Sequence, residues 1–290
     1  MSERVLITGA GGQLAVAIAA EFAKRAKVHA LGHVELDITS AAAVEREVSS
    51  FHPTHIVNCA AYNDVDEAED QAETALNVNA FGVRVLARAA ADTGAMLVHY
   101  STDFVFDGSA GRPYTEEDRP NPASVYAASK LLGEWFALEA PNAFVLRVAS
   151  LFGGTRAKSS VDRIVTALLE GREARVFSDR TASPSYVVDV ASATRQLVEQ
   201  GAPGLYHCVG TAHCTWHELG LEAAKLLHAE KGLLVPVSVA SVRMRASRPK
   251  YAALSNAKLA AIVPIPTWHD ALGRYVTEVL QQRAQPPSRQ

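Results

Sequence analysis

The sequence predicts an α/β protein with a doubly wound parallel sheet and a second, smaller mixed α/β domain. Three observations carry this prediction. The apolar run at residues 4–8 ends in a glycine cluster and leads into an alanine-rich helical segment. Apolar runs and helical segments then alternate as far as Val148, which is typical of a parallel sheet with helices on both faces. From about Ser150 the alternation weakens, which indicates a second unit.

The chain has 290 residues, enough for one large or two moderate domains with a buried core. We expect residues 1–149 and about 178–203 to form the larger, sheet-based domain. Residues of about 150–177 and 204–290 are expected to form the smaller domain.

The first turn has the glycine spacing of a dinucleotide-binding loop. Gly9 permits a tight turn, Gly12 lets the main chain approach a pyrophosphate, and Ala15 lets the helix pack closely on the strand. Phosphates would lie at the positive N-terminus of that helix. The alternative is a glycine-rich loop without a ligand, but the flanking strand and helix favour the dinucleotide.

The other elements follow in chain order. The predicted strands are 28–31, 55–58, 96–100, 143–148 and 175–177, and the predicted helices are 41–50, 79–93, 125–138, 161–170 and 187–198. Ser40 has the residue type and position of an N-cap for the helix at 41–50. The strand-like run 205–209 and the later residues are placed in the smaller domain.

Tyr126 and Lys130 are four residues apart on a predicted helix, so both can point at one reacting group. A phenol has a pKa of about 10, and a nearby ammonium favours the phenolate. The pair can therefore serve in proton transfer near neutrality. Tyr-x-x-x-Lys also occurs by chance on many helices, so the pair gains weight only from the motifs around it.

Ser101, Thr102 and Asp103 follow the predicted strand 96–100. In an open parallel sheet, ligands gather at the carboxyl ends of the strands, so these side chains emerge where chemistry is expected. The alternative for Thr102 is an ordinary polar residue at the end of a strand.

The composition bears on whether the protein binds nucleic acid or a membrane. The chain has 48% hydrophobic and 20% charged residues and a formal net charge of -3, which gives no reason to expect nucleic acid or an electrostatic membrane anchor. No apolar run approaches the ~18 residues of a membrane span. The N-terminus leads straight into the first strand and leaves no room for a signal peptide of roughly 15–30 residues, so we expect a cytoplasmic protein.

Cysteine and histidine usage does not predict a disulfide framework or a metal centre. Cys59, Cys208 and Cys214 are scattered. His213 and His217 are close in sequence, but the residues between them include a capping-box pattern, which predicts a helix start at Thr215-x-x-Glu218.

Together these motifs resemble the extended short-chain dehydrogenase/reductase family, whose larger domain is a Rossmann fold, and within it most nearly the dTDP-4-dehydrorhamnose reductases. The blocks that carry the narrower resemblance run from about Val5 to Leu259 in the expected order. They are Gly12-Gln13-Leu14, Glu35-Leu-Asp37-Ile38-Thr39, Asn58-Cys-Ala-Ala-Tyr62, Val65-Asp66-x-Ala68-Glu69, Ser101-Thr-Asp-Phe-Val-Phe-Asp-Gly108, Tyr126 with Lys130, and Arg248-Pro249 before Leu254-Ser255.

The resemblance implies NADPH or NADH as the cofactor. The residues that it implies for cofactor binding are Gly9, Gly12, Gln13, Leu14, Asp37, Ile38, Ala60, Ala61, Tyr62, Tyr100, Tyr126 and Lys130. The choice between the two cofactors stays open, because Gly32 and His33 follow the second strand. An acidic residue there would suit the ribose of NAD, and a basic one the 2′-phosphate of NADP.

The resemblance also implies a reaction, the reduction of the C4 ketone of a nucleotide-linked 6-deoxyhexulose, with dTDP-4-dehydro-L-rhamnose becoming dTDP-L-rhamnose. Tyr126 would donate the proton, Thr102 would hold the oxygen and Lys130 would bind the nicotinamide ribose. The implied substrate-binding residues are Thr102, Asp103, Ser150 and Arg248. Residues 243–250 include four cations, which suit a diphosphate or, alternatively, a solvated basic loop.

Departures from the family pattern leave alternatives open. Rhamnose-forming reductases usually have tryptophan where Ser150 stands, so the identity of the sugar stays open. Arg180, Ala182 and Ser185 replace the usual glutamine, glycine and threonine, so the nucleotide base that is recognised also stays open. One alternative is a reductase or epimerase for a different nucleotide sugar. A dehydratase is disfavoured, because Phe104 stands where those enzymes have glutamate.

A second alternative is a non-catalytic, cofactor-binding regulatory subunit resembling the β subunit of methionine adenosyltransferase. The glutamates proposed to hold magnesium in the family have no match, so no metal is predicted. A homodimer is expected from the resemblance alone.

Overall fold

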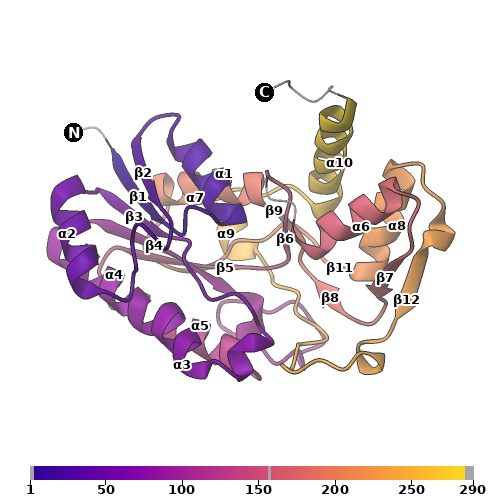
Figure 1. The fold of residues 1–290 in the computed structure, drawn as a ribbon, viewed down its shortest axis with the longest axis horizontal. Coiled ribbons are helices and arrows are strands. Elements are labelled where there is room, and N and C mark those ends of the chain that lie inside the picture. Colours follow the sequence, from indigo (N-terminus) through magenta and orange to yellow (C-terminus); the bar gives the residue numbers. More distant parts are fainter. Residues whose placement is uncertain (1–2, 156–157, 285–290) are drawn as a thin grey trace.

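A six-stranded sheet organises the larger domain in the computed structural model, which describes residues 3–155 and 158–284 (Figure 1). Its strands are β1 (Arg4–Thr8), β2 (Lys27–Leu31), β3 (His55–Asn58), β4 (Met96–Thr102), β5 (Ala143–Val148) and β10 (Gly204–His207). Neighbouring strands are all parallel, in the order β10-β5-β4-β3-β1-β2. The chain builds outward from β1 in both directions, so a topological switch point lies between β1 and β3.

Helices cover both faces of this sheet (Figure 1). The pair α1 (Gln13–Phe22) and α7 (Val187–Gln200) packs on one face, with Ile18 and Val190 in its core. The helices on the other face are α2 (Ala41–Phe51), α4 (Gly82–Thr93) and α5 (Val125–Ala137), with α3 (Ala72–Leu76) beside α5. The predicted doubly wound α/β fold is confirmed.

Local sequence signals set the helix ends. The Ser40 hydroxyl accepts a hydrogen bond from the main-chain nitrogen of Ala43, so it caps α2 as predicted. Gly94 ends α4 with a positive φ of 71°. Thr215 and Glu218 form the predicted capping box, and a helix starts there.

The smaller domain has its own apolar core, which includes Phe152, Leu168, Leu219 and Leu272. Its helices are α6 (Ser160–Leu169), α8 (Trp216–Leu226) and α10 (Trp268–Ala284), and its short strands pair as β7 (Ala174–Phe177) with β12 (Leu234–Val237), β8 (Thr181–Ala182) with β11 (Cys214–Thr215), and β6 (Leu151–Phe152) with β9 (Ser185–Tyr186). Figure 1 shows α6, α8, β7, β8, β11 and β12 together at one end of the molecule.

Two assignments from the sequence differ from the structure. The strands β8 and β9, at 181–186, fall in the range expected for the larger domain but pair with strands of the smaller one. Residues 204–207 were placed in the smaller domain, but β10 pairs with β5 at the edge of the large sheet. Leu259, in the short helix α9 (Ala257–Ala260), and Val263 also pack in the core beneath α1 and α7. The domain to which a strand belongs depends on its pairing with a distant strand, and a short apolar run does not show which strand that is. We therefore propose that 204–209 and about 255–265 belong to the larger domain.

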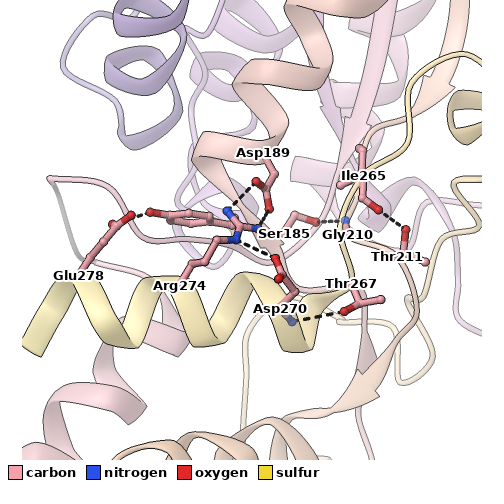
Figure 2. Close-up of polar contacts among 10 residues, drawn as sticks. Ser185, Asp189, Gly210, Thr211, Ile265, Thr267, Asp270, Arg274 and Glu278 are labelled. Carbon is pink, nitrogen blue, oxygen red and sulfur yellow. Dashed lines mark hydrogen bonds and ion pairs between the residues drawn. The ribbon is translucent and has the colours of Figure 1, made fainter.

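The last helix is tied to the larger domain by side chains. Figure 2 shows the Arg274 guanidinium of α10 between the carboxylates of Asp189, in the first turn of α7, and Asp270. The Tyr186 hydroxyl donates a 2.5 Å hydrogen bond to Glu278 of α10. Side-chain contacts thus link α10 to the start of α7 and to β9.

Candidate active site

Two adjoining cavities run along the carboxyl ends of β1, β3 and β4. Their volumes are about 580 and 650 Å³. Both are lined by Gly12, Ala60 and Ala61, so together they form one elongated groove across the switch point. This is the place where open α/β sheets bind their ligands.

Every residue predicted to bind the cofactor lines this groove. The first cavity is lined by Gly12, Gln13, Leu14, Ala60, Ala61, Tyr100, Tyr126 and Lys130, and the second by Gly9, Gly12, Asp37, Ile38, Ala60, Ala61 and Tyr62. The groove also includes Asn63, Thr74, Asn77 and His33, of which only His33 was considered from the sequence.

The first turn fits a dinucleotide phosphate. Gly9 has a φ of 69°, and a Cβ there would lie 2.7 Å from the main-chain nitrogen of Ala60, so no side chain fits. The following turn closes with a hydrogen bond from the Gly12 nitrogen to the Gly9 oxygen. Gly12 then leads directly into the N-terminus of α1, the positive end of the helix dipole. The residues at this end of the groove therefore fit the predicted cofactor.

The carboxylate of Asp37 forms hydrogen bonds within its own loop. It accepts hydrogen bonds from the main-chain nitrogen and the hydroxyl of Thr39, which hold its pKa below the ordinary value. Asp37 therefore lines the groove through a preformed turn.

The opposite end of the groove gathers Thr102, Tyr126 and Lys130. Ser124 caps α5, and its hydroxyl accepts from the Ala127 nitrogen, which sets Tyr126 and Lys130 on the helix face toward β4. The Lys130 ammonium donates a 2.6 Å hydrogen bond to the main-chain oxygen of Tyr100. Burial lowers the pKa of Lys130 to about 8, against an opposing effect from Glu134.

The expected effect of Lys130 on Tyr126 is not found. Burial raises the pKa of Tyr126 to about 12, although hydrogen bonding with the Thr102 hydroxyl opposes the rise. The prediction that the ammonium shifts the pKa of this phenol toward neutrality was wrong. The reason is that Lys130 is turned to Tyr100, and the loss of hydration dominates. Tyr126 is thus a protonated acid at neutral pH.

Thr102 and Asp103 form a buried polar pair beside Tyr126. The Thr102 hydroxyl donates to Asp103 Oδ1 at 3.0 Å and accepts from the Phe104 nitrogen at 3.2 Å. Burial raises the pKa of Asp103 to about 6, while the charge of Arg180 and the Thr102 hydrogen bond oppose the rise. Asp103 can therefore change charge close to pH 6.

A buried ion pair, missed in the sequence, lies behind these groups. Arg147 donates to both oxygens of Glu134 at 2.8 and 2.7 Å, and the Ser101 hydroxyl donates to Glu134 at 2.5 Å. Both charged side chains are 2% exposed. The network joins α5 to β4 and β5 and so fixes the relative positions of Tyr126 and Thr102. The available signal was that Glu134 lies four residues after Lys130, on the same buried face.

Ser150 lines the first cavity in a left-handed conformation, with a φ of 47°. Lys158 and Ser159 line the same side, and the sequence had not singled them out.

Arg248 lies outside the groove. It forms a forked ion pair with Asp66, at 2.9 and 2.7 Å, and Arg245 pairs with Asp70. The sequence left open whether the cations of this loop meet a diphosphate or solvent; two of them form ion pairs with the acidic segment after β3. A substrate-binding role for Arg248 would require it to share its guanidinium with that carboxylate.

Metal ligands do not cluster: residues 3–155 and 158–284 contain no group of three or more His, Cys, Asp and Glu arranged to hold an ion. Within the same ranges, no helix has the length and apolar character needed to cross a membrane.

The fold and the groove together have the architecture of the extended short-chain dehydrogenases/reductases: a parallel sheet with a switch point, a glycine turn and a Tyr-x-x-x-Lys helix at its edge. A model of the family described as RmlD substrate binding domain matches residues 3–281, and the chain belongs to this family. The resemblance inferred from the sequence is confirmed.

Named relatives cover nearly the whole chain. A dTDP-4-dehydrorhamnose reductase of Mycobacterium tuberculosis is 39% identical, over 93% of this chain and 91% of that protein. A probable dTDP-4,6-dihydroxy-2-methyloxan-3-one 4-ketoreductase of Streptomyces antibioticus is 35% identical, over 99% and 98%. The crystal structure of a Bacillus anthracis dTDP-4-dehydrorhamnose reductase with NADP has a TM-score of 0.90 and 33% identity, covering 96% of this chain and all of the other.

Proposed function

We propose that this protein uses NADPH or NADH to reduce the C4 ketone of a dTDP-linked 6-deoxyhexulose, converting dTDP-4-dehydro-L-rhamnose to dTDP-L-rhamnose. The observation that carries the proposal is the meeting of Thr102, Tyr126 and Lys130 with the Gly12-Gln13-Leu14 turn in one cavity. The names of the relatives support the substrate class, and the NADP complex of the Bacillus anthracis relative supports NADPH.

The residues at the end of β4 and on α5 have separate roles in the proposed reaction. When bound, the reduced nicotinamide supplies the hydride. Tyr126 keeps its proton at neutral pH and donates it to the substrate oxygen as negative charge develops there. Thr102 holds that oxygen in place by hydrogen bonding. Because Asp103 also competes for the Thr102 proton, the ionisation of Asp103 affects how freely Thr102 can donate.

Lys130 supports proton transfer by its charge and by binding the cofactor ribose. Its ammonium is held at the carboxyl end of β4 by the Tyr100 oxygen, one helical turn from Tyr126. In the proposed reaction this cation favours the phenolate that remains after the proton has left, an effect that burial outweighs while the phenol is protonated. Burial excludes water from this end of the groove, which strengthens the effect.

The first test is the oxidation of NADPH and NADH, followed optically, with dTDP-4-dehydro-L-rhamnose and a control without substrate. We expect substrate-dependent oxidation and the formation of dTDP-L-rhamnose. Dinucleotide binding without oxidation by this or any related keto-sugar would reject the proposal and favour a regulatory role, which pull-down of a stable partner enzyme would then establish.

Ser150 favours a second candidate, a reductase for a different dTDP-linked keto-sugar. A small side chain at this wall of the cavity leaves room for a sugar with another shape or substituent. The Streptomyces antibioticus relative carries the name of such an enzyme. A panel of dTDP-linked 4-keto sugars, compared by kcat/KM, separates the two candidates.

The expected homodimer is part of the proposal. Trp135 and Leu138, both on the surface at the end of α5, are 60% and 42% exposed, which supports association there. Light scattering after size-exclusion chromatography measures the oligomeric state directly. The cytoplasmic location stays a prediction.

A further inference from the structure

The motif Val65-Asp66-x-Ala68-Glu69 carried part of the family resemblance, but the proposed reaction gives it no role. In the structure its last residues, Glu67–Glu69, form one turn of 3₁₀ helix, η1, which contacts α5. On its other side the motif contacts residues 243–250, a segment that we call the strap. The motif therefore lies between the helix that carries Tyr126 and a part of the chain more than a hundred residues further on.

Asp66 holds the strap by both its main chain and a side chain. Its carboxylate accepts hydrogen bonds from the main-chain nitrogen of Ala246 at 2.9 Å and from the Arg248 guanidinium at 2.9 and 2.7 Å. These bonds hold the pKa of Asp66 well below its ordinary value, so the carboxylate is charged at neutral pH. At the end of the strap, the Lys250 oxygen accepts a 2.8 Å hydrogen bond from the main-chain nitrogen of Thr181, in β8. The strap is thereby bound to both domains.

Glu69 holds the start of the catalytic helix. Its carboxylate accepts a 2.9 Å hydrogen bond from the main-chain nitrogen of Val125, the first residue of α5. The first N–H groups of a helix have no acceptor within it, and the helix dipole favours a negative charge there. Ala68 is fully buried in the same apolar cluster as Tyr126. Since Tyr126 follows Val125 directly, η1 contacts the helix at the position of the proposed proton donor.

We propose that Asp66 and Glu69 are positioning residues that couple the strap to Tyr126: Asp66 fixes η1 on the strap, and Glu69 fixes the first turn of α5 on η1. The inference rests on the proposed function, in which Tyr126 donates the proton. Neither carboxylate is among the described residues that line the groove, so both act through other residues. A displacement of about 1 Å at a reacting group can cost about 10²-fold in rate, so a small shift of this turn is enough to matter.

Steady-state kinetics with NADPH and dTDP-4-dehydro-L-rhamnose test the role of Glu69. We expect Glu69→Ala to lower kcat about five- to tenfold, while the KM values and the Kd for NADPH stay within about twofold. The stoichiometry of NADPH binding corrects kcat for inactive protein. Glu69→Gln keeps an oxygen that can accept from Val125 and should recover most of the rate. The matched control is Glu73→Ala, which removes an exposed carboxylate from the first turn of α3 and should leave kcat within about twofold of the wild type.

A double variant tests the coupling. Asp66→Asn weakens the ion pair with Arg248, and we expect it to lower kcat about threefold or more. Because the two carboxylates act in one link, adding Asp66→Asn to Glu69→Ala should lower kcat little further. Losses that multiply in the double variant would overturn the coupling.

Hydrogen exchange of the full-length protein saturated with NADP⁺, followed by mass spectrometry, tests the link without the reaction. In Asp66→Asn, amide exchange should rise at least about threefold both in the strap and in the first turn of α5. In Glu69→Ala it should rise in the first turn of α5 and stay unchanged in the strap. Unchanged exchange at α5 in Asp66→Asn would overturn the coupling.

The outcomes separate this inference from the proposed function. Wild-type kcat in both Glu69→Ala and Asp66→Asn, together with normal ketone reduction by the wild type, overturns the inference and leaves the function standing. Exchange that spreads from the strap to α5 in a protein that reduces no keto-sugar supports the link and rejects the reaction.

Discussion

The side-chain amide of Gln13 donates a 2.6 Å hydrogen bond to the main-chain oxygen of Gly153, across the boundary between the domains. The same nitrogen lies 3.3 Å from the Asp162 carboxylate, at the start of α6. Gln13 is the first residue of α1 and was predicted to bind the cofactor. Its side chain instead forms hydrogen bonds with the smaller domain, so we expect only its main chain to bind a phosphate.

Replacing Gln13 with Leu should therefore affect the domain contact more than the cofactor. The substitution keeps the approximate size and removes both hydrogen bonds. We expect the free energy of unfolding to fall by about 1–2 kcal/mol, measured by urea denaturation, and the Kd for NADPH to change less than about threefold. Loss of NADPH affinity at unchanged stability would instead place the amide on the cofactor.

Tyr126→Phe removes the proposed proton donor and keeps the ring that packs against Phe104. Turnover should fall by about 10²-fold or more, while NADPH binding, followed by fluorescence, stays close to that of the wild type. Turnover within a factor of two of the wild type would exclude Tyr126 as the acid.

The rate should decline in alkaline solution because of Lys130. Its pKa is lowered from 10.5 to about 8, so the ammonium that dominates below this pH is lost above it. Tyr126 still holds its proton there, since its pKa is raised to about 12. We expect kcat/KM to fall above about pH 8. In Lys130→Arg, a charge that persists should move this decline to higher pH; a flat wild-type profile to pH 9.5 would contradict the assignment.

Two helical glycines make a matched pair for stability. A Cβ at Gly133 of α5 would lie 2.1 Å from the main-chain oxygen of Asn79, whereas one at Gly273 of α10 would meet nothing within 4 Å. Gly133→Ala should destabilise the protein by about 3 kcal/mol, since neither backbone can move without the other. Gly273→Ala should stabilise it by about 0.5–1 kcal/mol. Thermal denaturation measures both, and equal effects would disprove the close approach.

Glu134→Gln should be among the most harmful substitutions outside the groove. It leaves the Arg147 guanidinium buried without its counter-charge, which typically costs about 3–5 kcal/mol. Adding Arg147→Met should recover part of this loss, because the unpaired charge is then absent. Glu21→Gln, at a surface pair with Lys24, is the control and should cost less than about 1 kcal/mol. A double variant less stable than Glu134→Gln alone would contradict this account.

The sequence predicted best those features that depend on neighbouring residues, namely the bounds of strands and the residues at their carboxyl ends. The strands at 55–58 and 143–148 were predicted to the residue, because short apolar runs bounded by turn formers define them. The groove residues were predicted well for a related reason. The carboxyl ends of parallel strands meet at one edge, so the polar residues that follow them must gather there.

Ion pairs between residues far apart in the chain could not be predicted from the sequence. The partner of Arg248 is Asp66, which is 182 residues away, so a basic segment that looked free for phosphate is in fact neutralised. Arg180 is the converse case, since it was noticed only as a departure from a family pattern, and its half-buried side chain lies near Asp103 and lines the same cavity as Trp216. The direction of the Tyr126 pKa shift was also wrong, because burial cannot be measured from the spacing of two residues.

The placement of β10 beside β5 has a consequence for how the chain matures. The large sheet is discontinuous in sequence, so a ribosome must release residues beyond 207 before its last strand can join. Until then β5, with the buried Arg147, presents an open row of main-chain donors and acceptors that other chains can pair with. A fragment ending near residue 149 would carry all three proposed catalytic residues and should nevertheless aggregate, because the strand that covers the edge of β5 comes from the last third of the protein.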